Sequence, residues 1–436
     1  MRWSRRSRRT VQLALGQILQ ETTVRDGLPR VATSLVEEST TKLFVGLRSM
    51  SQSSVKPNRN IYMTDELQAI YDQTVEFVAK EVVPHGDSWE AAGKVPRETL
   101  RQMGELGMLA LRVPEEHGGL GMGMLASATF SEALGQSTFA GFDVTVLVHT
   151  DMAGPHLVNS GSPEQLKQWM PGVVAGETIL SIGVSEPDAG SDVAGIRTVA
   201  VKDGDGWRIS GTKTFITNAV YGDMTIIAAK TDPANKYGIT MFIVPADTEG
   251  FSVANKLDKH GWRCSDTAEL VLNDVWVPDS AVLGTVHRGF YETMKNFQNE
   301  RMVLVGMGVG AAQAAIDLTS DYVGNRPAFG GQLSDLGAIR QRMAMNQARV
   351  DAVRAGMYHA AWLGDQGEDN VREMSGVKAL GCEVVNDVMY DCLQFHGGLG
   401  YMRESTIERM TRDARILPIG GGATEVMLEE VAKRLL

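Results

Sequence analysis

The sequence predicts an α+β protein built from an N-terminal α-helical domain, a middle β domain and a C-terminal α-helical bundle. From about Met63 to about residue 176, apolar residues recur at helical spacing. Between about 178 and 280 they form short β-rich runs, and from about 286 to Leu436 long helical periods rich in Ala, Leu, Met and Val return. The predicted domains therefore cover residues 63–177, 178–285 and 286–436, and residues 1–62 form an extension.

Length and composition agree with this organisation. The chain has 436 residues, enough for roughly three domains at about 150 residues each. Its 43% apolar content suffices for a sizeable buried core. The formal net charge of −11 disfavours a surface for polyanions, so no nucleic-acid partner is expected.

Metal-binding and membrane-spanning patterns are missing from the sequence. The three cysteines lie far apart, and we expect reduced, mostly buried thiols of an intracellular protein. His149 and His156 have no acidic or thiol companion at ligand spacing, so no metal site is expected. No apolar run approaches the roughly 18 to 20 residues of a membrane span, so no transmembrane segment is expected.

Residues 1–62 do not share the pattern of the rest. Arginines crowd residues 1–9, no acidic residue comes before Glu21, and Ser and Thr recur up to Ser54. This composition is typical of a mitochondrial transit segment. Two other interpretations stay open: a true start at Met63, or a tail outside the fold. We expect a cytoplasmic protein if the source is bacterial, or a mitochondrial matrix protein if residues 1–20 are a transit segment.

The first helical domain is predicted to begin after Thr64. Its hydroxyl can cap a helix that carries Asp65 and Glu66 in the first turn. An apolar face begins at Leu67 and recurs at helical spacing to Val78. Further periodic stretches predict that helices continue to about residue 176.

The middle domain shows strand and turn signals. TVAV, the turn DGDG and WRIS predict a hairpin, and TIIAA, YGITMFIV and AELVLNDVWV predict further strands. In the last domain, GMGVGA at 306–311 has the spacing of a dinucleotide-binding turn. However, no acidic residue lies about 20 positions further on, where Arg326 is found, and the Ala-rich surroundings favour a tightly packed helix. An NAD-dependent dehydrogenase is therefore disfavoured.

Two Gly-rich segments carry the strongest functional signal. GVSEPDAGSDVAG at 183–195 gathers small and oxygen-bearing side chains, so backbone N–H groups and hydroxyls can approach a flat anionic cofactor. QFHGGLGYMRESTIERMTRD at 394–413 is a Gly-rich bend that leads into a charged helix. Together they resemble the two signature segments of the acyl-CoA dehydrogenase family, and the resemblance extends from about Met63 to the C-terminus. It implies an FAD cofactor and a homotetramer made of two dimers.

The resemblance implies that the β domain holds half of the flavin site. Residues 182–191 are expected along the isoalloxazine edge, while KTFITN supplies an aromatic ring and a hydroxyl near flavin N5. The expected contacts are Ile182, Val184, Ser185, Gly190, Ser191, Phe215, Ile216 and Thr217. Ser191 is also expected to contact the CoA portion of the substrate.

The other half of the flavin site is expected to come from a neighbouring subunit. The guanidinium of NRPAFG suits the flavin pyrophosphate, and the Gly-rich bend resembles the one that receives the adenine side. The expected contacts are Arg326, Phe329, Gln394, Gly397 and Gly398. Near the C-terminus, Ala423 and Glu425 are further expected cofactor contacts. The chain departs from the family at Leu336 and Gly337, where relatives often carry polar flavin contacts.

The implied reaction forms a 2,3-double bond in an acyl thioester. It needs a base for the Cα proton, hydrogen-bond donors for the enolate oxygen and a hydride acceptor facing Cβ. Many family members carry the base near the C-terminus, where this chain has Gly421. Isovaleryl-CoA and long-chain members also have glycine there and place a glutamate directly before an arginine on another helix, which matches Glu300 and Arg301. Glu300 is the expected base, and the N–H of Gly421 is an expected donor to the thioester carbonyl.

The remaining expected substrate contacts are Gln298, Arg301 and Gly422. The three glycines at 420–422 leave room for bulky or branched acyl groups, and YDCLQFHGGLGYM resembles long-chain members. The implied activity is α,β-dehydrogenation of a medium-chain, long-chain or branched acyl-CoA, with electrons passed to electron-transferring flavoprotein. Two alternatives stay open: a flavoprotein without a working base that serves as a binding or scaffolding subunit, and an acyl-CoA oxidase that reduces O₂.

Overall fold

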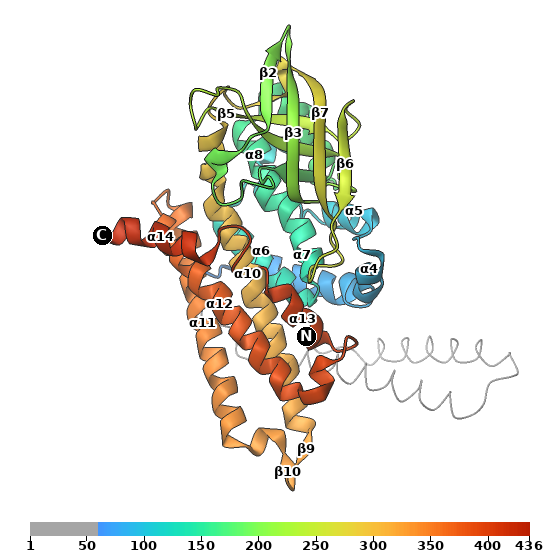
Figure 1. Ribbon diagram of the computed structural model, residues 1–436. Helices are drawn as coiled ribbons and strands as arrows, with labels where there is room; N and C mark the ends of the chain where they lie inside the picture. Colours follow the sequence, from blue (N-terminus) through green and yellow to red (C-terminus); the bar gives the residue numbers. More distant parts are fainter. Residues whose placement is uncertain (1–59) are drawn as a thin grey trace, which may run out of the picture. The chain divides into compact units, whose positions relative to one another are not determined.

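The computed structural model describes residues 60–436 of the chain. The predicted extension over 1–62 therefore lies outside the described residues, except for its last three. Helices, a β-sheet and a second set of helices follow one another along the chain, as Figure 1 shows in blue, green to yellow, and orange to red. The predicted α+β class with a β domain between two helical domains is confirmed.

The first helical part begins at its predicted cap. Thr64 Oγ1 accepts the N–H of Leu67 at 3.2 Å, and Asp65 and Glu66 occupy the first turn. Its helices are α3 (Asp65–Phe77), α4 (Gly86–Ala92), α5 (Arg97–Glu105), α6 (Met124–Leu134), α7 (Ala140–Leu147), α8 (Gly154–Ser160) and α9 (Pro163–Val174). A π-helical turn, η4 (Val148–Ala153), joins α7 to α8. Every residue of α7 is buried, which explains why it is apolar on almost all sides.

The middle part is an eight-stranded mixed sheet. Its strands are β1 (Leu180–Gly183), β2 (Val199–Asp203), β3 (Gly206–Thr217), β4 (Met224–Lys230), β5 (Ile239–Pro245), β6 (Phe251–Lys256), β7 (Thr267–Pro278) and β8 (Val282–Leu283). The order is β6-β7-β3-β2-β4-β5-β8, and β1 pairs in parallel with β4. β4 and β5 contribute side chains to two separate apolar clusters. Every residue of these two strands is buried except the last of each. The runs TIIAA and YGITMFIV therefore form strands with both faces covered, whereas most of β2 is exposed.

The last part is organised around one long helix. α10 (Gly289–Asn325) runs from the sheet to a short hairpin of β9 (Pro327–Ala328) and β10 (Gly331–Gln332) at the opposite end of the bundle (Figure 1). It packs against α11 (Gly337–Asp365), α12 (Val371–His396) and α6. The chain continues through η8 (Gly397–Tyr401), α13 (Thr406–Ala414) and α14 (Thr424–Leu435).

The GMGVGA segment is continuous helix within α10, not a strand-to-helix turn. A Cβ on Gly306 would lie 2.0 Å from Ser131 Oγ, and one on Gly310 would lie 2.0 Å from the carbonyl oxygen of Glu132. The glycines therefore let α10 approach α6 closely, and the segment does not form a dinucleotide-binding turn.

The sequence-based expectation that no apolar run reaches membrane-spanning length is wrong for α10. By length and composition this helix could cross a membrane, because its most apolar 18-residue window has a mean hydropathy of 1.5. Of that window, 78% is buried inside the protein, which is the position of a core helix. α10 is the single helix of this kind within residues 60–436.

Candidate active site

Glu300 lies on α10 in a pocket of buried polar side chains. Its side chain is 14% exposed, and Oε1 accepts a hydrogen bond from Asn296 Nδ2 at 3.1 Å. His156 Nε2 lies 3.8 Å from the same oxygen, is almost fully buried and has no other hydrogen-bond partner. The carboxylate is thus held by its own helix on one side and bordered by α8 on the other.

The π-helical turn η4 connects this carboxylate to the sheet. The carbonyl oxygen of Asp151 accepts from the side-chain amides of Asn296 and Asn299, both at 3.0 Å. His149 Nδ1 accepts the N–H of Leu180, the first residue of β1, at 3.1 Å. Burial lowers the pKa of His149 to about 4, so this histidine is neutral and acts as a structural link. π-Helical turns often occur at functional sites, and here one links the helix that carries Glu300 to the first strand.

A buried ion pair holds the segment that follows β1. Lys213 Nζ lies 2.7 Å from Glu186 Oε1 and also donates to the carbonyl oxygen of Val184 at 3.1 Å. Burial lowers the pKa of Lys213 to about 8. Burial also raises the pKa of Glu186, but the charge and hydrogen bond of Lys213 and the N–H groups of Arg197 and Thr198 outweigh it and hold that pKa below its usual range. The glutamate of the signature segment therefore fixes the loop from inside.

The first set of predicted flavin contacts is brought together at the end of β3. The N–H of Thr214 donates to the carbonyl oxygen of Ser185 at 3.0 Å, so the two predicted segments are neighbours. An irregularity in the β3–β7 register turns Phe215 outward, with a positive φ of 61° and 70% exposure. Ile216 is buried and Thr217 half-buried. A bulky residue at positive φ is strained, and such strain is concentrated at functional sites.

The rest of the first set lies at the end of β1 and in the loop that follows it. Ile182, Val184 and Ser185 are half-buried, whereas Gly190 and Ser191 are exposed. A Cβ added at Gly190 would meet nothing within 4 Å, so the backbone is open to close approach there.

The second set lies at the far end of α10. Phe329, at the tip of the β9–β10 hairpin, has a positive φ of 52° and is 92% exposed, and Arg326 is exposed as well. The end of α12 lies beside this hairpin, because Tyr322 stacks on His396 at 4.3 Å between ring centroids. The predicted contacts from that end are exposed: Gln394, Gly397 and Gly398. At 1.5 Å per residue, Glu300 and the end of α10 are about 38 Å apart, so a single chain does not bring the two sets together.

The loop before α14 lies against α10 beside Glu300. Gly421 has a positive φ of 62°, and a Cβ there would lie 2.2 Å from Leu304 Cδ1. Leu304 is one helical turn beyond Glu300, so the two share a face of α10. Among the described residues, the N–H of Gly421 has no hydrogen-bond partner. The Glu300 carboxylate and this backbone N–H therefore lie on the same side of α10.

Arg301 and Gly422 are also adjacent. A Cβ on Gly422, whose φ is 103°, would lie 3.6 Å from Arg301 Nε. Arg301 is buried and donates to Gln298 Oε1 at 2.9 Å, and burial lowers its pKa. Ala423 and Glu425, at the start of α14, line a separate cavity of about 430 Å³.

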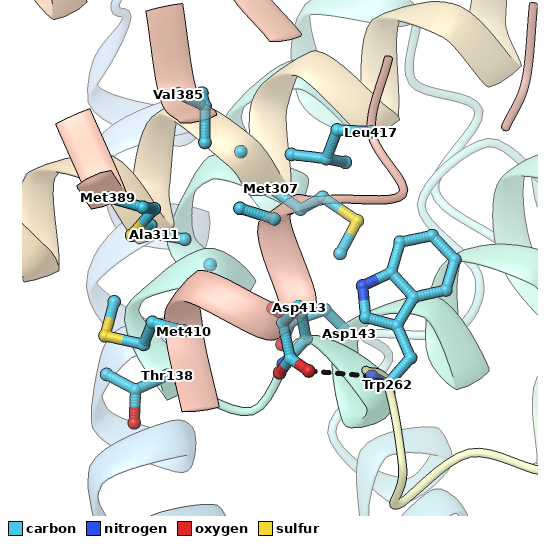
Figure 2. Close-up of a pocket in the computed structure, with 14 residues that line it drawn as sticks. Thr138, Asp143, Trp262, Met307, Ala311, Val385, Met389, Met410, Asp413 and Leu417 are labelled. Carbon is cyan, nitrogen blue, oxygen red and sulfur yellow. Dashed lines mark hydrogen bonds between the residues drawn. The ribbon is translucent and has the colours of Figure 1, made fainter. Parts of the chain in front are cut away.

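A small apolar cavity lies on α10 beyond Leu304. Met307 and Leu417 border it, and it also has two acids, Asp143 and Asp413, in its wall (Figure 2). Asp413 accepts the backbone N–H of Trp262 at 2.7 Å, and burial raises its pKa to about 7. The cavity volume is about 20 Å³, roughly the room for one water molecule.

Sequence reasoning missed the buried charged side chains that hold these segments, Glu186, Lys213 and Lys378, and the histidine next to the base, His156. One of them had a signal: Lys378 falls on the helical face of Met374 and Cys382. A lysine on a buried face needs a specific partner, but the sequence does not say which. Within residues 60–436, no group of three or more His, Cys, Asp or Glu side chains could hold a metal ion.

Comparison with known proteins identifies the class to which this fold and site belong. Models of the N-terminal, middle and C-terminal domains of acyl-CoA dehydrogenases match residues 64–177, 181–275 and 287–436. The chain belongs to the acyl-CoA dehydrogenase family. Members of this family are FAD-dependent oxidoreductases that dehydrogenate acyl-CoA thioesters, and a homotetramer is typical of them.

Individual relatives are similar over most of their length. The mitochondrial long-chain specific acyl-CoA dehydrogenase of Sus scrofa is 37% identical over 366 residues, which cover 83% of this chain and 84% of that protein. A crystal structure of a probable acyl-CoA dehydrogenase from Mycobacterium abscessus has a TM-score of 0.84 at 37% identity, covering 86% of this chain and all of that one. A chain in the structure of the electron transferring flavoprotein of Acidaminococcus fermentans has a TM-score of 0.83 at 30% identity, covering 86% and 98%. Relatives include both bacterial and mitochondrial proteins.

The residues present fit FAD. Backbone is open to approach at Gly190 and Gly397, since a Cβ at either would meet nothing within 4 Å. Phe215 offers an exposed ring to a flat ring system, and Arg326 offers exposed donors to a phosphate.

Proposed function

We propose that this protein dehydrogenates medium-chain, long-chain or branched acyl-CoA thioesters with Glu300 as the base and the N–H of Gly421 as a donor to the thioester carbonyl. The observation that carries the proposal is their juxtaposition. Gly421 rests on Leu304, one turn from Glu300 on the same face of α10, and its N–H is without a partner among the described residues.

The residues of the chain divide the chemistry between them. Glu300 removes a proton from Cα, and the electron pair left behind spreads onto the thioester oxygen. The N–H of Gly421 stabilises that oxygen, and a backbone donor fixed in advance needs no reorganisation during the reaction. FAD, when bound, would supply the acceptor for the hydride from Cβ, which the formation of a trans double bond between Cα and Cβ requires. The expected product is the trans-2-enoyl-CoA.

The glycines beside Glu300 affect which acyl groups have room to bind. Gly421 and Gly422 both have positive φ, and neither projects a side chain toward the site. A glutamate at position 421 would clash with Leu304. Because the proposed base stands on α10 instead, the space beside residues 420–422 is left to the acyl group. We therefore place a bulky or branched acyl group beside residues 420–422, with Gln298, Arg301, Gly422 and Ser191 as further substrate contacts.

We further propose that two subunits share each flavin site. The first set, on the β domain, is linked to Glu300 through η4, whereas Arg326 and Phe329 lie about 38 Å away along α10. One dinucleotide does not span that distance, so the second set serves the site of a neighbour. Ala423 and Glu425 complete the proposed cofactor contacts. In the proposed homotetramer of two dimers, a neighbouring subunit provides the second set of contacts to each flavin site.

Electron-transferring flavoprotein is the proposed electron acceptor. Support comes from the family and from the similarity to the chain from Acidaminococcus fermentans. The proposed location is the cytoplasm for a bacterial source and the mitochondrial matrix if residues 1–20 direct import.

The deciding experiment is anaerobic titration of the FAD-loaded protein with straight-chain and branched acyl-CoA thioesters. Flavin absorbance is expected to bleach with at least one series in the wild type and not in Glu300→Gln. Bleaching that is equally fast in Glu300→Gln overturns the assignment of the base. Lack of bleaching with every thioester favours a scaffolding subunit, and rapid peroxide release in air favours an oxidase.

A further inference from the structure

Lys378 lies under the loop that carries Gly421. Its side chain comes from α12, is 1% exposed, and donates to the carbonyl oxygens of Leu417, Gly420 and Gly422 at 2.6, 3.0 and 3.0 Å. An ammonium group has three N–H donors, and here all three are directed to one loop. Burial lowers the pKa of Lys378 below its usual value.

A buried charge of this kind is not an ordinary core residue. Removing an ammonium from water is costly, and a well-packed apolar residue of similar volume is often as stable in a core. Met374, one turn earlier on α12, is such a residue and is fully buried. What distinguishes position 378 is a turn of irregular backbone beneath it, whose carbonyl groups need donors.

Two of the three carbonyl groups flank Gly421. The oxygen of Gly420 and the N–H of Gly421 belong to one peptide plane and, in a trans peptide, point in opposite directions. A donor that holds the oxygen of Gly420 therefore directs the N–H of Gly421 away from α12. Holding the oxygen of Gly422 anchors the loop again one residue after Gly421, and glycine at φ of 62° and 103° has no Cβ to limit its rotation otherwise.

We propose that Lys378 is a positioning residue that aims the N–H of Gly421 at the thioester carbonyl. The proposal rests on the function assigned to Gly421 above. It predicts that removing the ammonium weakens polarisation of the carbonyl and slows proton abstraction, while substrate still binds. The loop would then rotate among several directions, and the donor would be correctly aimed only part of the time.

The test compares Lys378→Met with a matched variant, Lys259→Met. Lys259 is a half-buried ammonium whose pKa is also lowered by burial, to about 8, but it donates to the carbonyl oxygen of Ser265 and to Thr267 Oγ1 in the β domain. Each FAD-loaded variant is mixed anaerobically with acyl-CoA to measure the rate of flavin reduction. Each is also saturated with a non-oxidisable acyl-CoA analogue labelled with ¹³C at the thioester carbon, and the infrared stretch of the bound carbonyl is recorded.

In the wild type, the carbonyl stretch is expected at lower wavenumber than in free analogue. Lys378→Met is expected to lose most of this displacement and to reduce its flavin on the order of 10- to 100-fold more slowly, with a dissociation constant for the analogue changed far less. Lys259→Met is expected to keep the wild-type displacement even if it melts at lower temperature. A wild-type displacement in Lys378→Met overturns the proposal.

The same measurements separate this proposal from the proposed function. If wild-type protein is not reduced by any acyl-CoA, the function itself fails; if it is reduced and Lys378→Met matches its rate, the positioning role alone fails. If Lys378→Met yields no FAD-loaded protein, the same measurements are made on Lys378→Gln instead. Its shorter, uncharged amide reaches fewer of the carbonyl groups, so an intermediate displacement supports the proposal and a wild-type displacement overturns it.

Discussion

The two ends of α10 differ in how far the functional residues there are packed against other parts of the same chain. At the Glu300 end, the neighbouring polar residues Asn296, Asn299 and Arg301 are buried, and η4 links them to the sheet. At the other end, Arg326 and Phe329 are exposed. One chain thus assembles the proposed acid–base half of the site but only presents the second set of predicted cofactor contacts to its surroundings.

The comparison is sharper because both regions hold an aromatic residue in the same strained backbone conformation. Phe215 and Phe329 both have positive φ and are both mostly exposed. Strain at a bulky residue persists only where the surrounding structure imposes it. At Phe215 the register irregularity of β3 imposes it; at Phe329 the tight β9–β10 hairpin does. Each ring is held outward, ready to contact something other than its own core.

The largest effect is expected at the buried end, from Glu300→Gln. The amide is isosteric but does not accept a proton, so flavin reduction should slow by on the order of 10³-fold. Stopped-flow absorbance under anaerobic conditions measures the rate. Glu292→Gln is the matched control, since Glu292 lies two turns earlier on α10 and pairs with Lys295. Equal losses in both variants would show that α10 was disturbed rather than the base removed.

A methyl group at Gly421 should give the next largest effect. In Gly421→Ala the new Cβ meets Leu304 Cδ1, and the left-handed backbone costs an L-residue about 1 to 2 kcal/mol. Flavin reduction should therefore slow on the order of 100-fold, because the donor is displaced.

Adding Leu304→Ala tests whether the two residues act on each other. The second substitution removes the clash but not the backbone strain, so the double variant should recover part of the rate. Gly376→Ala on α12 is the control: its Cβ meets only Val431 at 3.8 Å, and no slowing is expected. If the double variant is slower than Gly421→Ala, the contact with Leu304 is not what displaces the loop.

The exposed end should respond in cofactor affinity instead of chemistry. Arg326→Ala removes a charge-assisted phosphate contact worth about 1.5 to 3 kcal/mol, so FAD should bind roughly 10- to 100-fold more weakly. Isothermal titration of apoprotein with FAD measures this, and turnover per bound flavin should change little. Arg372→Ala, which breaks a surface pair with Glu373, should leave FAD affinity unchanged. Unaltered affinity in Arg326→Ala would remove this end from the flavin site.

Much of this organisation follows from the sequence because it depends on local patterns. The cap at Thr64, the hairpin turn between β2 and β3 and the helical period of α10 each arise within a few residues. The position of Glu300 was predicted from a motif, and so was the glycine at 421. Glu300 lies on α10, and Gly421 lies in the loop before α14, against Leu304 one turn further along that helix. Their roles stay predictions.

The parts that escaped prediction depend on distant contacts. Lys378 meets carbonyl oxygens 39 to 44 residues away, and Lys213 pairs with an acid 27 residues away. Nothing local distinguishes Lys213 from a solvated lysine, and the apolar helical face on which Lys378 falls does not reveal its partners. The positive φ at Phe215 escaped as well, because it arises from a register irregularity between two strands, and an aromatic residue gives no sign of it.

Buried acids lie against the middle of α10, between its two ends. The smallest expected effect comes from them and is a dependence of the free energy of unfolding on pH. Burial and the charge of Glu90 raise the pKa of Asp413 from 3.8 to about 7. The groups that face it are Glu90, Asp143, Lys259, Cys264, Arg409 and Arg412. Between the unfolded value of 3.8 and about 7, the folded state binds this proton and the unfolded state does not, so the free energy of unfolding falls as pH rises.

From about pH 6 to about pH 8, this single group should lower the free energy of unfolding by roughly 1.4 kcal/mol, and no further loss should follow above that range. Urea unfolding at several pH values measures it. Asp413→Asn should flatten the slope, even though the amide serves the N–H groups of Trp262 and Ala140 less well and lowers stability at every pH. The exposed Asp188→Asn should keep the wild-type slope. A slope that persists in Asp413→Asn would mean that another of the facing groups titrates there, and that the middle of α10 is packed against an ionised Asp413 throughout.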